Sequence, residues 1–133
     1  MTYKFTIYGR LPCLNDYLGA ERIKINTKYG KFQTKGNVMK HEAQDLIISY
    51  IRKDLRELHI DKPIKIHYNF YEPNRKRDHD NVISFIMKTV QDSLVLAKVI
   101  DNDGWANIVG ASYTPNVDAN NPRIEVFLIE QEV

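Results

Sequence analysis

The sequence predicts an α+β fold, a single compact domain over residues 1–133 in which a mixed β-sheet is backed by two main helices. Three observations support this class. Several short segments alternate apolar and polar residues, two longer segments carry apolar residues at helical spacing, and the order is strand, loop, helix, strand, helix, strand, strand. The length of 133 residues and the hydrophobic content of 43% suit one packed domain.

The first part of the chain predicts a strand, a long loop and a helix. Residues 3–8 alternate apolar and polar side chains, as a half-buried strand does. Residues 9–35 show no sustained period, so a long loop that carries most of the basic excess is expected there. Residues 38–59 place apolar side chains at helical spacing and end before Pro63, which predicts an amphipathic helix.

The middle of the chain predicts a strand followed by a second helix. Residues 64–71 alternate strictly, which indicates a strand with one face on the core. Residues 80–96 are helical in pattern, and Asp80 and Asn81 are both good N-caps. The apolar stripe of this helix consists of Val82, Phe85, Ile86, Val90 and Leu94.

The last third predicts a turn and two strands. Residues 99–104 break the second helix, and residues 105–113 and 123–129 then form strands separated by a loop over 115–122. Trp105 is expected in the core, because aromatic residues in strands are more often packed there than stacked on bases.

Charge is distributed unevenly along the chain. The net charge is +2, yet residues 1–40 carry +6 and the remainder carries −4. A basic segment attracts phosphates and an acidic one holds cations, which favours a metal-dependent nuclease, although a solvated basic loop is the commoner cause of such a run.

Composition also bears on the compartment. Cys13 is the single cysteine, so it cannot form an internal disulfide; it is expected to be partly buried, and a cytoplasmic location is expected. The chain opens without a signal-peptide pattern and has no apolar run of membrane-spanning length, so no membrane partner is expected. The four histidines lack a paired zinc spacing and are expected at the surface or partly packed.

The most informative segment precedes the second helix. Three basic residues, Arg75, Lys76 and Arg77, stand directly before two carboxylates, Asp78 and Asp80, at positions i and i+2. In an extended backbone this spacing points both carboxylates to one side, where they can share a divalent cation. Mg²⁺ needs only one or two carboxylates before substrate phosphate completes its shell.

Asp101 and Asp103 repeat this spacing after the second helix. Each pair alone has a structural explanation, a helix cap for Asp80 and an Asp-Gly turn for the later pair. A calcium loop is excluded because aligning Gly104 with its glycine puts Gly110 where an acid is required. Whether the two pairs converge depends on how the turn folds back along the helix, which the sequence leaves open.

Residues 75–81, the helix after them and residues 99–103 resemble the RusA family of Holliday-junction resolvases. That family carries a basic run, an Asp-x-Asp-Asn opening of a lysine-containing helix, then a hydrophobic pair and an acidic pair. Residues 12–17 are similar to the family's early Pro-x-x-Asn-x-x-Tyr-like segment, so the resemblance covers nearly the whole chain.

The resemblance implies that Asp78, Asp80 and Asp103 bind Mg²⁺ and act in catalysis. The family has adjacent acids where this chain has Asp101 and Asp103 separated by Asn102, so either can be the third ligand, and Asp103 is preferred. For the family's catalytic lysine, one alignment selects Ser84 and the other, which we prefer, selects Lys88.

The resemblance further implies a homodimer, of a kind often carried by a phage or prophage, that acts in DNA recombination and repair. It would bind four-way DNA junctions by shape and make two symmetrical cuts. The DNA backbone would be held by Arg75, Lys76 and Arg77 and by the early lysines Lys24, Lys28, Lys31 and Lys35. The alternative is a DNA-binding module without catalysis, in which the aspartates only cap and turn.

Overall fold

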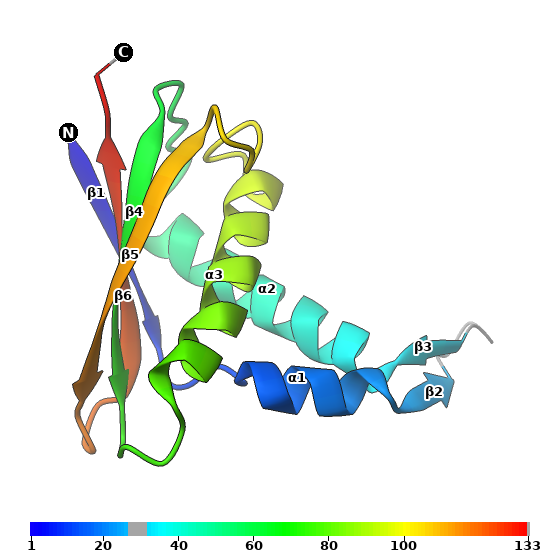
Figure 1. The fold of residues 1–133 in the computed structure, drawn as a ribbon. Coiled ribbons are helices and arrows are strands. Elements are labelled where there is room, and N and C mark those ends of the chain that lie inside the picture. The colour runs from blue at the N-terminus through cyan, green and yellow to red at the C-terminus, as the bar shows by residue number, and fades with distance from the viewer. Residues whose placement is uncertain (27–31, 133) are drawn as a thin grey trace.

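The computed structural model describes residues 1–26 and 32–132. Figure 1 shows a sheet with helices on one side and a small hairpin projecting away from it. The elements in chain order are β1 (Thr2–Tyr8), α1 (Leu14–Glu21), β2 (Lys24–Asn26), β3 (Phe32–Thr34), α2 (Lys35–Leu55), β4 (Ile64–Glu72), α3 (His79–Leu96), β5 (Ile108–Val117) and β6 (Arg123–Glu130).

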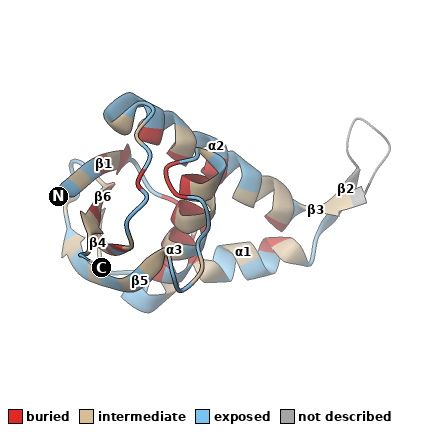
Figure 2. Cartoon of the chain, turned by 90° about the horizontal axis from the view of Figure 1, so that it is seen from above, coloured by how far each residue is buried: buried red, intermediate tan, exposed pale blue. Residues whose placement is uncertain are grey.

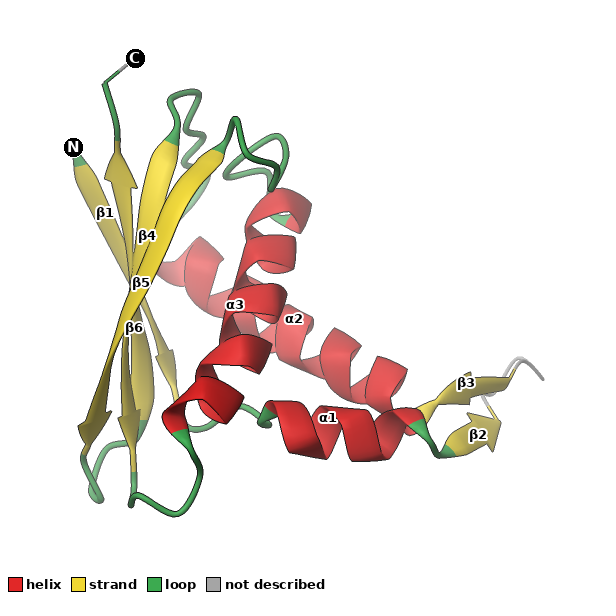
Figure 3. Cartoon of the chain, viewed as in Figure 1, coloured by secondary structure: helices red, strands yellow, loops and turns green. Residues whose placement is uncertain are grey.

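The main sheet is mixed, as the sequence predicts. Its strand order is β1-β6-β4-β5, and β2 and β3 form a separate two-stranded hairpin. β6 is antiparallel to both β1 and β4, whereas β4 and β5 run parallel. Because parallel neighbours need a crossover connection, α3 returns the chain from the end of β4 to the start of β5. The α+β class is therefore confirmed, with all helices on one face of the sheet (Figure 3).

The core lies between this face and the helices. The inward residues of β4 are Ile64, Ile66, Tyr68 and Phe70, all at most 2% exposed. The predicted apolar stripe of α3 is buried against them, and so is the inner face of β6 (Figure 2). The two alternating strands and the second helix are confirmed, because each pattern has the period of the element that it predicts.

The predicted loop over residues 9–35 is wrong. This segment contains α1 and the β2–β3 hairpin, so a third, shorter helix joins the two main ones. The Asp16 carboxylate accepts a hydrogen bond from the backbone N–H of Cys13 (3.1 Å), and Tyr17 packs against Phe85 with ring centroids 5.6 Å apart. A helix of 8 residues is too short to show a clear period and depends on such tertiary contacts.

Other element boundaries also differ. α2 ends at Leu55 rather than near residue 59. The next residue, Arg56, adopts a positive φ of 57°, which ends the helix. β5 begins three residues after Trp105, whose side chain is 97% exposed, so the prediction that it lies in the core is wrong. β5 also continues through Pro115 to Val117, because an edge strand can accommodate a residue without an N–H.

In the part of the chain that the structure describes, no helix is long and apolar enough to cross a bilayer.

A close approach between α1 and α2 generates the first prediction. A Cβ atom on Gly36, at the start of α2, would lie 2.9 Å from the backbone nitrogen of Glu21. Gly36→Ala should therefore lower the free energy of unfolding by about 1–3 kcal/mol, the usual cost of overpacking. The matched control is Gly19→Ala in α1, where a Cβ atom meets nothing within 4 Å and the higher helix propensity of alanine should be neutral or stabilising. Urea unfolding measures both, and equal stability of the two variants would contradict this contact.

Candidate functional site

Asp78 and Asp80 lie at the amino end of α3. The helix begins at His79, one residue before the predicted start, so Asp78 occupies the N-cap position. The Asp78 side chain makes no capping hydrogen bond, and the Asp80 carboxylate accepts a hydrogen bond from the backbone N–H of the next residue, Asn81 (2.9 Å). Both side chains are exposed. Within the described residues neither carboxylate has an ion-pair partner, so both can accept further ligands.

The amino ends of α1 and α3 meet beside these carboxylates. The Asn81 side-chain oxygen accepts a hydrogen bond from the backbone N–H of Asn15, which lies in the first turn of α1 (2.9 Å). The unpaired N–H groups of a helix amino end create a positive potential that favours negative groups. Two such ends therefore help this corner to hold the charges of Asp78 and Asp80, and they also favour a phosphate there.

A buried ion-pair network positions the loop that leads into α3. Glu72, the last residue of β4, is 7% exposed and accepts hydrogen bonds from Arg77 Nε (2.8 Å), Arg77 Nη2 (2.9 Å) and Arg10 Nη2 (2.9 Å). Arg77 Nη1 donates to the carbonyl of Leu11 (3.0 Å). The guanidinium of Arg77 is thus engaged within the protein, whereas Arg75 and Lys76 are exposed and available to phosphate.

This network shifts the pKa of Glu72. Burial alone would raise the pKa of the carboxyl, but the hydrogen bonds and positive charges of Arg77 and Arg10 outweigh it and hold the pKa below its ordinary value. Glu72 is therefore ionised at neutral pH. Its role is to fix the loop, since it holds Arg77 by two parallel hydrogen bonds.

A groove opens next to Asp78. It runs past the carboxyl ends of the parallel strands β4 and β5, and its lining includes Asn74, Arg75, Asp78, His79 and Asn116. Ligands of open sheets commonly bind outside the carboxyl ends of parallel strands, near a helix amino end. The groove brings basic and acidic side chains together at the carboxyl ends of these strands, as a site for a metal and a phosphate requires.

The early lysines lie elsewhere. Lys24 is in β2 and Lys35 is the first residue of α2, and the hairpin projects from the far end of α1 (Figure 1). This basic surface is separated from the acidic pair by the length of α1. Lys28 and Lys31 lie outside the described residues.

The two candidates for the catalytic lysine position share the exposed face of α3 with Asp80. The Ser84 hydroxyl donates to the carbonyl of Asp80 (2.7 Å). The Lys88 side chain is 67% exposed, and its ammonium lies 3.9 Å from the Asp92 carboxylate. Lys88 is two turns along the helix, about 12 Å from Asp80 along the axis.

Asp101 and Asp103 do not join Asp78 and Asp80 within one chain. α3 has 18 residues and is about 27 Å long, and the later pair lies in the turn beyond its carboxyl end. Figure 1 shows that this turn leads to the start of β5, at the end of the sheet opposite the start of α3. The three aspartates expected to form one site, Asp78, Asp80 and Asp103, are therefore not brought together in a single copy of the chain.

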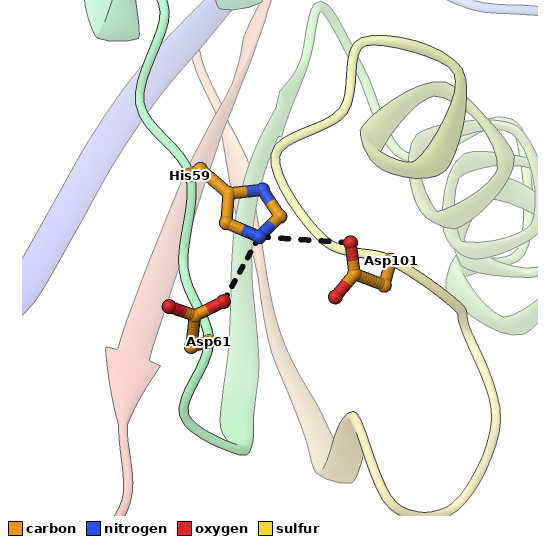
Figure 4. A group of neighbouring side chains, drawn as sticks. All are labelled: His59, Asp61 and Asp101. Carbon is orange, nitrogen blue, oxygen red and sulfur yellow. Dashed lines mark hydrogen bonds and ion pairs between the residues drawn. The ribbon is translucent and has the colours of Figure 1, made fainter.

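Asp101 instead belongs to a cluster that the sequence reasoning missed. His59 Nε2 lies 3.0 Å from Asp61 Oδ1 and 3.6 Å from Asp101 Oδ1 (Figure 4). The pKa of His59 is raised by the hydrogen bond of its ring to the Lys98 carbonyl and by the charges of Asp101 and Asp61, against a smaller desolvation effect. The His-x-Asp spacing of His59 and Asp61 was a visible signal, but the approach of Asp101 required the fold.

No family model matches this chain, and no curated protein matches it. Membership of the RusA family therefore stays a proposal that rests on the residues.

The Glu72 network predicts how stability depends on pH. Because the folded pKa of Glu72 is depressed, its contribution is present above the ordinary value of 4.5 and is lost as the pH falls through the folded value. Glu72→Gln should lower the free energy of unfolding at pH 7 by roughly 2–4 kcal/mol, somewhat below the full cost of breaking a buried pair because Arg10 is partly exposed. The difference from the wild type should shrink below pH 4.5 in urea titrations. Glu57→Gln, at an exposed position, is the control, and a difference independent of pH would contradict the ion-pair account.

Proposed function

We propose that this protein is a magnesium-dependent endodeoxyribonuclease that resolves four-way DNA junctions in recombination and repair. The observation that carries the proposal is the exposed pair Asp78 and Asp80 at the meeting point of two helix amino ends, directly after Arg75 and Lys76. The order of these residues along the chain resembles that of the RusA resolvases.

The donor set suits the metal. Two exposed carboxylates offer oxygen ligands to Mg²⁺, which prefers oxygen and keeps open positions for water and phosphate. When bound, the ion would supply an activated water and stabilise charge on the scissile phosphate. The chain's own contribution is to hold Asp78 and Asp80 on a rigid helix end, which the Glu72–Arg77 pair fixes to β4.

The basic residues would hold the DNA backbone. Arg75 and Lys76 stand shortly before the acidic pair in the chain, and Lys24 and Lys35 lie at the end of the molecule that carries the hairpin. These two groups of basic residues would contact separate segments of the DNA backbone. Such contacts release counterions, so binding should weaken steeply with salt.

Because the two acidic pairs are separated within one copy, a site that contains all three aspartates requires a homodimer with shared sites. If two copies lie with their α3 helices antiparallel about a twofold axis, Asp103 of one copy approaches Asp78 and Asp80 of the other. Each composite site would then contain three carboxylates, and the dimer would make two symmetrical cuts. This arrangement keeps the roles expected for Asp78, Asp80 and Asp103 and leaves Lys88 or Ser84 on the same helix face as Asp80.

The same separation favours a second candidate, a DNA-binding module without catalysis. In that case Asp78 and Asp80 only begin a helix, Asp103 only forms a turn, and the basic residues provide structure-selective binding.

Cleavage of a labelled four-way junction beside a linear duplex of equal length distinguishes the two candidates. With Mg²⁺, paired symmetrical cuts are expected in the junction and not in the linear duplex. Excess chelator should abolish the cuts because it removes the metal ion that activates the water. Tight, salt-sensitive junction binding without any cut would replace the nuclease by the binding module. Absence of both cutting and binding would reject both.

Substitution of the acids tests both catalysis and the sharing of sites. Asp80→Asn should abolish cleavage and preserve or tighten junction binding, since it removes a metal ligand and a negative charge close to phosphate. Asp45→Asn, at an exposed position in α2, is the matched control and should cut normally.

Mixing Asp80→Asn with Asp103→Asn then reports on the dimer. Composite sites predict that the mixed dimer regains one intact site and nicks one strand, although each variant alone is inactive. No recovery in a mixture shown by sedimentation to contain mixed dimers would reject shared sites.

A further inference from the structure

We propose that His59, Asp61 and Asp101 bind a divalent transition cation of the Zn²⁺ type, at the end of α3 opposite the Asp78 and Asp80 pair. This proposal is independent of the proposed nuclease function. It concerns residues from two segments about 40 positions apart, the α2–β4 connection and the turn after α3.

The distances between the three ligand atoms fit such an ion. Nε2 of His59 lies 3.0 Å from Asp61 Oδ1 and 3.6 Å from Asp101 Oδ1, and the three atoms all lie within 4.8 Å of one another. Zn²⁺ binds nitrogen and oxygen at about 2.0–2.2 Å in tetrahedral sites, which places neighbouring donors about 3.4 Å apart. The two measured separations lie on either side of this value.

The tautomer of His59 also fits. Nδ1 of His59 lies 2.8 Å from the carbonyl oxygen of Lys98, and since that oxygen can only accept, Nδ1 carries the hydrogen and donates it. In the neutral ring Nε2 then carries no hydrogen, and its lone pair would bind a cation placed between the ring and the two carboxylates. A second ring nitrogen bonded to a backbone carbonyl is the usual support of a metal-binding histidine. This hydrogen bond comes from outside the three ligands.

The ligands stand on a rigid base. Ile60, between His59 and Asp61, is 2% exposed, and Ile100, directly before Asp101, is 1% exposed. The backbone N–H of Ile60 donates to the carbonyl of Val99 (2.8 Å), which ties the two segments together. The backbone that carries the three ligands is therefore already in place when an ion binds, and the site lies at the surface, where an ion can enter.

The chemistry of the set selects the class of ion. One imidazole nitrogen with two carboxylates suits Zn²⁺ and its neighbours, whereas Mg²⁺ prefers oxygen alone. Three protein ligands leave a position for water. The competing explanation is a simple ion pair, in which a protonated His59 bridges Asp61 and Asp101 without any metal.

Calorimetric titration of the full chain with Zn²⁺ decides between these explanations. One equivalent per chain is expected for the wild type, and a tenfold excess of Mg²⁺ should not displace it. Asp61→Asn and Asp101→Asn should each weaken binding by more than about 100-fold, the upper end of the loss caused by removing an outer hydrogen-bond partner. Asp61 is 87% exposed, so its variant should fold normally.

Three controls keep the result specific. His41→Gln and Asp45→Asn, both at exposed positions in α2, should bind Zn²⁺ as the wild type does. His59→Gln should abolish binding, and Co²⁺ bound to the wild type should show the absorption of a tetrahedral site that this variant lacks. Unchanged binding in Asp61→Asn and Asp101→Asn, or loss of binding in His41→Gln or Asp45→Asn, would overturn the proposal. Cleavage by the proposed nuclease would be scored separately, with Mg²⁺ alone.

Discussion

A helix that connects two parallel neighbouring strands must run back along the length of the strands, because the second strand starts at the same end of the sheet as the first. In this protein α3 makes that connection between β4 and β5, and its stripe from Val82 to Leu94 is buried on the sheet. Since the helix is about 27 Å long, the residues just before it and just after it lie at opposite ends of the sheet. The positions of all four acidic candidates follow from this one constraint.

At the amino end of α3, the same loop forms both a structural ion-pair network and the candidate site. Glu72 holds Arg77 by two hydrogen bonds, and the next residue, Asp78, begins α3. The converging amino ends of α1 and α3 lower the electrostatic cost of the exposed carboxylates. The basic run therefore divides into one arginine that fixes the loop and two residues, Arg75 and Lys76, that face solvent and remain available to a substrate.

At the carboxyl end of α3, the turn after the helix contacts the α2–β4 connection. Asp101 joins His59 and Asp61 there, whereas Asp103 stays outside that cluster. The i, i+2 spacing that suggested one paired ligand set thus separates two acids with different neighbours. If α3 pairs with its copy, Asp103 can lie beside Asp78 and Asp80 of the other subunit, while Asp101 stays with His59 and Asp61 in its own subunit. The two proposals therefore do not need the same side chain.

The sequence by itself determined the α+β class, the buried faces of β4 and β6 and the stripe of α3, because strict periods of two and of about 3.6 residues are local properties of the chain. It also identified Asp78 and Asp80 beside a basic run. Only the tertiary structure decided that residues 9–35 contain α1 and a hairpin, that Trp105 is exposed, that Arg77 is engaged with Glu72, and that Asp101 lies beside His59. These features depend on contacts between segments 5 to 66 residues apart, and such contacts arise from packing, which no local pattern records.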